Sequence, residues 1–188
     1  MGFLDSILGR SRPPQADLDV LFSVPQAALS LESHGYRFAG QGAVCFRVAE
    51  GAAFTTVETE VRGLISTDAG TTVEQVDDSY GFRWLSVTAP QDDVTGLVTS
   101  LHAVNSSLTD AGFGSALLCS TVTFVASDDR RIALVYLYKR GTFYPFVPAG
   151  GDHRDNALEL QVKVIVADDV PVEADLSRWL AIWGAPGL

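Results

Sequence analysis

The pattern that most constrains the fold lies in the second half of the chain, where one amphipathic helix precedes three apolar strand-like segments. Apolar residues over 94–108 recur at helical spacing, Asp92 or Asp93 can cap the helix, and Ala111-Gly112 can end it. The three strand segments that follow, separated by the turn sequences SDDR and KRG, are 115–126, 131–139 and 142–147. A helix followed by strands with short turns predicts an α+β fold, with an antiparallel sheet and helices packed on one face.

The segment after the third strand, residues 157–167, fits two patterns. Alternating apolar residues would suit a strand, whereas Leu158, Val162 and Ile165 also form a helical stripe. Asp155 or Asn156 could cap such a helix, as Asp and Asn commonly do. We expect a helix, which would complete a helix–three strands–helix unit, and keep the strand as the alternative.

The first half of the chain gives weaker signals. Asp17 can cap a short helix that Pro25 ends or kinks, and the following ALSLES alternates as a strand would. YRFAGQGAVCFRV predicts one or two strands, residues 52–66 a helix, and TVEQV and FRWLSVTA a hairpin joined by DDSYG. A short helix from Asp175 is expected near the end of the chain.

The domain organisation follows from the prolines of SRPP, which resist both helix and sheet. We expect an amphipathic segment and linker over 1–14 and one α+β domain over 15–188, with a division into halves 15–90 and 91–188 left open. The apolar side chains of the opening segment are Phe3, Leu4, Ile7 and Leu8. They favour a docking segment for a partner, with packing on the chain's own domain and transient membrane contact as alternatives.

Composition excludes several classes of function. Hydrophobic residues make up 47% and charged residues 19% of the 188, as in a globular protein. A formal net charge of −10 argues against nucleic-acid binding, which needs a basic face. No signal peptide or membrane-spanning run is visible, and the two cysteines lie in apolar runs as reduced thiols would. We therefore expect a cytoplasmic protein, and we keep a peripheral position at the inner face of the membrane as a second option.

Motifs that carry catalysis are missing from the sequence. It has no phosphate-binding loop, dinucleotide fingerprint, nucleophile elbow or metal-ligand spacing, so we expect no cofactor, no metal and no enzymatic activity. One loop, GGDHRDN, does group titratable residues, namely Asp152, His153, Arg154 and Asp155. These four support an alternative hypothesis, a small-ligand or enzymatic pocket near the loop; the simpler interpretation is a solvated loop that caps the next helix.

The hairpin sequence YLYKRGTFYPFVP is unusually aromatic. Its aromatic side chains are Tyr136, Tyr138, Phe143, Tyr144 and Phe146. Because residues alternate between the two faces of a strand, both faces of this hairpin are partly apolar and one needs a cover beyond the core. The cover could be RWLAIW, a protein partner or a second copy of the chain, so the hairpin is a candidate partner-binding surface and a homodimer stays an alternative.

Six segments together indicate a family: MGFLD, CFRVAEGAAF, DDSYGFRW, YLYKRGTFYPFVP, RDNALELQ and DLSRWLAIWGAPGL. In these segments the chain resembles the actinobacterial PspA-associated protein family PspAB. The resemblance spans nearly the whole chain and implies an accessory role beside PspA, a coiled-coil protein of membrane remodelling, in phage-shock or envelope stress. It implies no catalytic residue.

The order of elements over 92–168 is also similar to type III secretion chaperone-like domains, including the YbjN type, which bind protein segments. We therefore hypothesise a non-enzymatic cytoplasmic accessory protein that binds a protein partner, PspA or another protein of the stress module.

Overall fold

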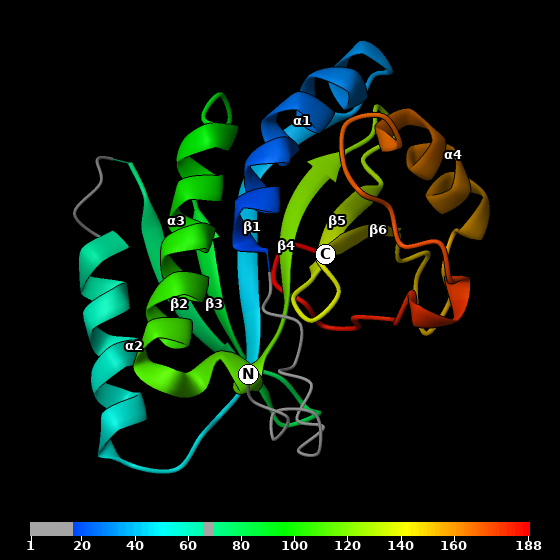
Figure 1. The fold of residues 1–188 in the computed structure, drawn as a ribbon. Coiled ribbons are helices and arrows are strands. Elements are labelled where there is room, and N and C mark those ends of the chain that lie inside the picture. The colour runs from blue at the N-terminus through cyan, green and yellow to red at the C-terminus, as the bar shows by residue number, and fades with distance from the viewer. Residues whose placement is uncertain (1–16, 66–69) are drawn as a thin grey trace, which may run out of the picture.

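The fold is a single open sheet of six antiparallel strands in the order β2-β3-β1-β4-β5-β6 (Figure 1). The computed structural model describes residues 17–65 and 70–188. The strands are β1 (Arg37–Arg47), β2 (Thr72–Asp77), β3 (Phe82–Thr88), β4 (Leu117–Val125), β5 (Arg131–Leu137) and β6 (Thr142–Phe146). The α-helices are α1 (Val24–Ser33), α2 (Ala52–Ile65), α3 (Val94–Leu108) and α4 (Asn156–Val166).

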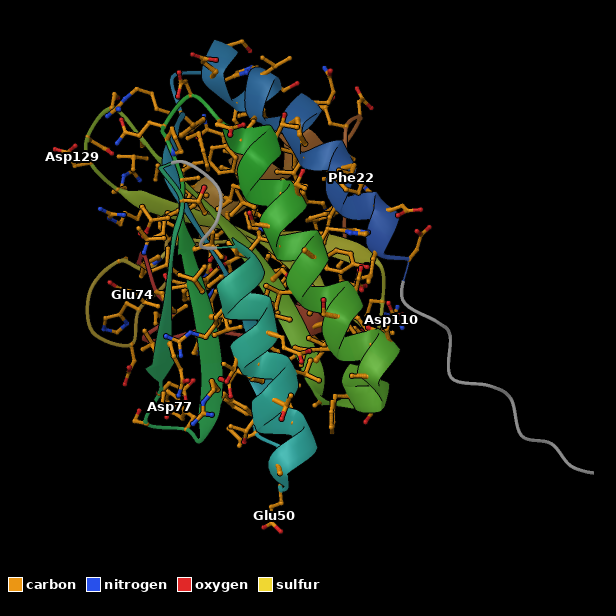
Figure 2. All side chains as sticks on the ribbon, turned by 90° about the vertical axis from the view of Figure 1, so that its left-hand side faces the viewer. Phe22, Glu50, Glu74, Asp77, Asp110 and Asp129 are labelled. Carbon is orange, nitrogen blue, oxygen red and sulfur yellow. The ribbon has the colours of Figure 1, made fainter. Side chains whose placement is uncertain are left out.

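The helices cover one face of the sheet and enclose the larger part of the core. Figure 2 shows α2 and α3 side by side along this face, with Glu74 and Asp77 on the edge strand β2. Leu97 and Leu101 of α3 are fully buried against β1. A side chain at Gly42 of β1 would place its Cβ 2.5 Å from the Thr121 carbonyl oxygen and about 3 Å from both leucines. Glycine is therefore what allows α3 and β4 to approach β1 so closely.

The order predicted for the second half is confirmed as α3-β4-β5-β6-α4. Asp93 caps α3 by accepting a hydrogen bond from the Gly96 N–H at 2.8 Å. The ambiguous segment 157–167 is helical up to Val166: Leu158, Val162 and Val166 are buried at intervals of four residues, Glu159 is buried beside them, and Leu160, Gln161 and Val164 are exposed. That spacing is helical and not the alternation of a strand.

Two local predictions were wrong. The strand expected at ALSLES is part of α1, because Pro25 stands in the first turn of that helix, where its missing N–H costs nothing, and does not end a helix there. A 3₁₀ helix, Leu18–Ser23, precedes α1. The helix expected from Asp175 is only one 3₁₀ turn, Leu176–Arg178, because the residues after it spread over the sheet.

The second face of the sheet is covered by the C-terminal segment, defined here as residues 174–188. Just before it, the chain pairs with the edge strand β6, where the Phe143 N–H donates to the Pro171 carbonyl and the Glu173 N–H to the Phe143 carbonyl. The segment then crosses the sheet, drawn red in Figure 1, and the Gly187 carbonyl accepts a hydrogen bond from Arg131 of β5. Across residues 17–65 and 70–188, no helix is long and apolar enough to span a membrane.

Candidate functional site: a groove on the second face of the sheet

The C-terminal segment leaves an apolar hollow of about 440 Å³ between itself and the sheet, here called the groove. Its buried base is formed by Cys45, Trp84, Cys119 and Tyr144, which come from four different strands. Residues 180–183 of the C-terminal segment also line it. The groove is thus a product of the tertiary structure, since no two strands supply its lining alone.

The exposed part of the groove is set by the turn between β2 and β3. Asp78 accepts hydrogen bonds from the N–H groups of Tyr80 (2.8 Å) and Phe82 (2.9 Å) and from the Trp84 indole (3.0 Å). These bonds hold the turn against Trp84 and leave the Tyr80 side chain, also a lining residue, 60% exposed. The sequence DDSYG therefore builds a rigid turn that presents an aromatic side chain at the groove.

Three titratable groups in the groove, Asp78, Tyr144 and Cys45, have pKa values shifted by their surroundings. Burial would raise the pKa of Asp78, but the bonds from Trp84, Phe82 and Tyr80 outweigh it and the pKa is lowered. Burial raises the pKa of Tyr144, whose hydroxyl donates to the Leu180 carbonyl at 2.8 Å. The neighbouring Cys119 side chain, and then burial, raise the pKa of Cys45. Asp78 is thus a structural carboxylate, and the groove offers mainly an apolar surface.

The five aromatic residues of the hairpin are buried, so the structure does not present them as an exposed partner surface. Tyr136, Tyr138 and Phe143 belong to the core on the helical face. Tyr144 and Phe146 lie on the second face, where Tyr144 stacks on Trp179 with ring centres 5.9 Å apart and Phe146 meets Trp183 edge-on at 5.0 Å. The cover that the sequence left open is therefore the C-terminal segment, and only Tyr144 of the five lines the groove.

The four residues of the GGDHRDN loop point in different directions. Asp152 and His153 are exposed, and Asp155 caps α4 by accepting from the Leu158 N–H at 3.0 Å. Arg154 instead turns inward, donating to Glu159 at 2.9 Å and to the Trp179 carbonyl, with its guanidinium 5.0 Å from the centre of the Phe146 ring. Arg154 thus ties α4 to the C-terminal segment, so two of the four loop residues, Arg154 and Asp155, make structural contacts.

The remaining candidate groups can be placed briefly. Phe3, Leu4, Ile7 and Leu8 lie outside the described residues. Over 17–65 and 70–188, His, Cys, Asp and Glu side chains form no group of three or more that could hold a metal ion. Sequence reasoning missed the groove itself, although DDSYG and the two cysteines were visible. Only the strand order shows that the DDSYG turn and the two cysteines line the same groove.

Comparison with known proteins gives one result. A family model described as PspA associated protein B matches residues 1–187. The chain belongs to the PspAB family. Membership implies an association with the PspA stress module, as the sequence resemblance did. Searches of the curated proteins and of the solved structures gave no match for this PspAB chain.

Proposed function

We propose that this PspAB protein is a non-enzymatic, cytoplasmic accessory protein that binds PspA, its groove taking an apolar segment of PspA. The observation that carries the proposal is the groove, an apolar hollow with an exposed aromatic residue at its opening on a chain that belongs to a PspA-associated family. Exposed apolar concavities on soluble folds commonly mark binding sites. Binding to PspA would also place this PspAB protein at the inner face of the membrane.

The chemistry of the groove supports binding and not catalysis. Its one carboxylate, Asp78, already accepts three hydrogen bonds that hold the turn, so it is poorly placed to act as a base. The hydroxyl group at its base, on Tyr144, donates to a backbone carbonyl. What the groove offers an incoming group is apolar contact with Trp84, Phe82 and Ile182, bordered by the charge of Arg47.

The test is direct binding of the purified full chain to purified PspA, with two matched variants. Tyr80→Asp places a charge at the groove, whereas Leu29→Asp places one on α1, on the helical face; the two side chains are 60% and 61% exposed, so neither change should disturb the core. We expect Tyr80→Asp to weaken binding at least tenfold, on the order of a tyrosine hot spot, and Leu29→Asp to leave it unchanged.

Two outcomes would contradict the proposal. If the wild-type chain shows no binding to PspA, the partner is wrong. If Tyr80→Asp binds as tightly as Leu29→Asp, the groove is not the surface. A further variant, Val164→Asp, tests the exposed apolar side of α4 as an alternative binding surface.

A small apolar molecule is the second candidate occupant. A volume of about 440 Å³ lies within the range of small-ligand pockets, and the lining is mostly apolar. This candidate predicts that an apolar fluorescent probe binds the wild-type chain and is displaced by PspA if the two share the groove.

A further inference from the structure

The two cysteines of the chain face each other across the central strands of the sheet. Cys45 of β1 lies directly opposite Cys119 of β4 in the antiparallel register. Both are free thiols, 3% and 8% exposed, and both line the base of the groove. Because they belong to different halves of the chain, only the pairing of β1 with β4 brings them together.

This register brings the two Cα atoms within the separation that a disulfide spans. Directly opposed residues of antiparallel strands have Cα atoms about 4.5 or 5.5 Å apart, depending on their hydrogen-bonding position. Disulfides span Cα separations of about 4.4–6.8 Å, and the Cα spacing of either kind of pair lies in that range. The pairing also shifts by one residue immediately after Cys45, which interrupts the regular ladder beside the pair.

We propose that Cys45 and Cys119 form a dithiol site that small-molecule disulfides convert to an intramolecular disulfide. The site does not depend on what the groove binds. The groove gives such a reagent a route to both sulfurs, and the apolar base holds them in place once one has reacted.

The reaction balances as two thiol–disulfide exchanges. The thiolate of Cys119, the more exposed of the two, attacks one sulfur of the reagent RSSR and releases RS⁻, leaving a mixed disulfide. Cys45 then loses its proton and attacks the Cys119 sulfur, which breaks the mixed disulfide and releases the second RS⁻. Both protons end on the leaving thiols, so two cysteine thiols and RSSR give one protein disulfide and two RSH.

Oxidation would join the two halves of the sheet at its centre. β1 closes the part of the sheet built by the first half of the chain, and β4 begins the part built by the second. A covalent link between them would prevent the halves from separating and remove both thiols from the base of the groove. Because exchange is reversible, a reducing thiol would restore the original state.

The test is equilibration of the full chain with buffers of reduced and oxidised glutathione, followed by acid quenching, thiol counting and mass measurement. The chain contains only two cysteines, so a monomer that has lost two hydrogens identifies the Cys45–Cys119 disulfide. We expect the folded chain to become half-oxidised at a value of [GSH]²/[GSSG] at least about tenfold higher than the urea-unfolded chain. The reason is that folding has already met the cost of bringing the two thiols together.

Single variants resolve the order of attack. Cys45→Ser, which keeps Cys119, should accumulate the mixed disulfide with glutathione, whereas Cys119→Ser should react much more slowly. The proposal is overturned if the folded wild type keeps two free thiols in buffers that oxidise the unfolded chain, or if it forms only intermolecular dimers. Because both results concern the wild type, the test holds even where a variant fails to fold.

Discussion

Removing Trp179 should separate the C-terminal segment from the sheet. The side chain is 6% exposed, stacks on Tyr144, and donates from its indole N–H to the Glu173 carbonyl at 3.0 Å. An aromatic side chain of this kind buries about 150–250 Å², and truncation of a buried tryptophan to alanine costs about 3–5 kcal/mol. Because the lost side chain lies beneath a peripheral segment that can partly collapse, we expect Trp179→Ala to lower the free energy of unfolding by about 3 kcal/mol.

The control is its neighbour, Leu180→Ala. The Leu180 side chain is 62% exposed, and its backbone carbonyl, which accepts the Tyr144 hydroxyl, is unchanged by the substitution. Exposed substitutions of this kind usually change stability by no more than about 0.5 kcal/mol.

Urea unfolding followed by far-ultraviolet circular dichroism measures both variants without relying on tryptophan emission. Binding of an apolar dye should also rise in Trp179→Ala, as Tyr144 and Phe146 lose their cover. If Trp179→Ala loses no more stability than Leu180→Ala, the C-terminal segment does not cover the second face. The aromatic hairpin would then again be a candidate partner surface.

Three further predictions concern polar groups. Arg154→Met leaves the Glu159 carboxylate buried with only the Val147 N–H as partner, so it should lower the free energy of unfolding in urea by about 3 kcal/mol. Adding Glu159→Leu should lower it little further. If the losses of stability from the two substitutions simply add, the pairing is contradicted. Burial alone would raise the pKa of Glu173, but hydrogen bonds from the Asp175 N–H, Thr142 and Arg140 lower it. The stability that this carboxylate contributes is therefore complete above about pH 4.3, the ordinary pKa of a glutamate, and is lost as pH falls through the lowered value. Glu173→Gln should flatten this part of the stability–pH curve, and an unchanged slope would refute the assignment. Asp93→Ala removes the cap of α3 and should lower the thermal midpoint by an amount that corresponds to about 1 kcal/mol, whereas Asp92→Ala should have almost no effect.

Local physics made the second half of the fold predictable. The α3 pattern has a cap, a continuous apolar stripe and a glycine at its end, and the three strands that follow are separated by short polar turns. Each of these signals acts within a few residues, so tertiary contacts had little to override. At α1 a local rule misled, because a proline can begin a helix as readily as end one.

The candidate site was far less predictable. The aromatic hairpin attracted attention because its composition is unusual, yet burial on both faces makes its side chains part of the core. The loop GGDHRDN gathered the right residue types for a ligand site, but backbone direction sends Arg154 inward and Asp155 to the helix cap. Residue type along a loop does not fix where side chains converge, whereas helix capping depends on neighbours three residues away.

By itself, the sequence determined the family, the α+β class and the elements of the second half, because these depend on segment-wide similarity and on short-range periodicity. Only the tertiary structure decided that the C-terminal segment covers the second face, that a groove lies beneath it, and that Cys45 meets Cys119. Those features arise from the pairing of β1 with β4 and from a chain end that crosses several strands. Such contacts join residues distant in sequence, and no local pattern encodes which of them will lie side by side.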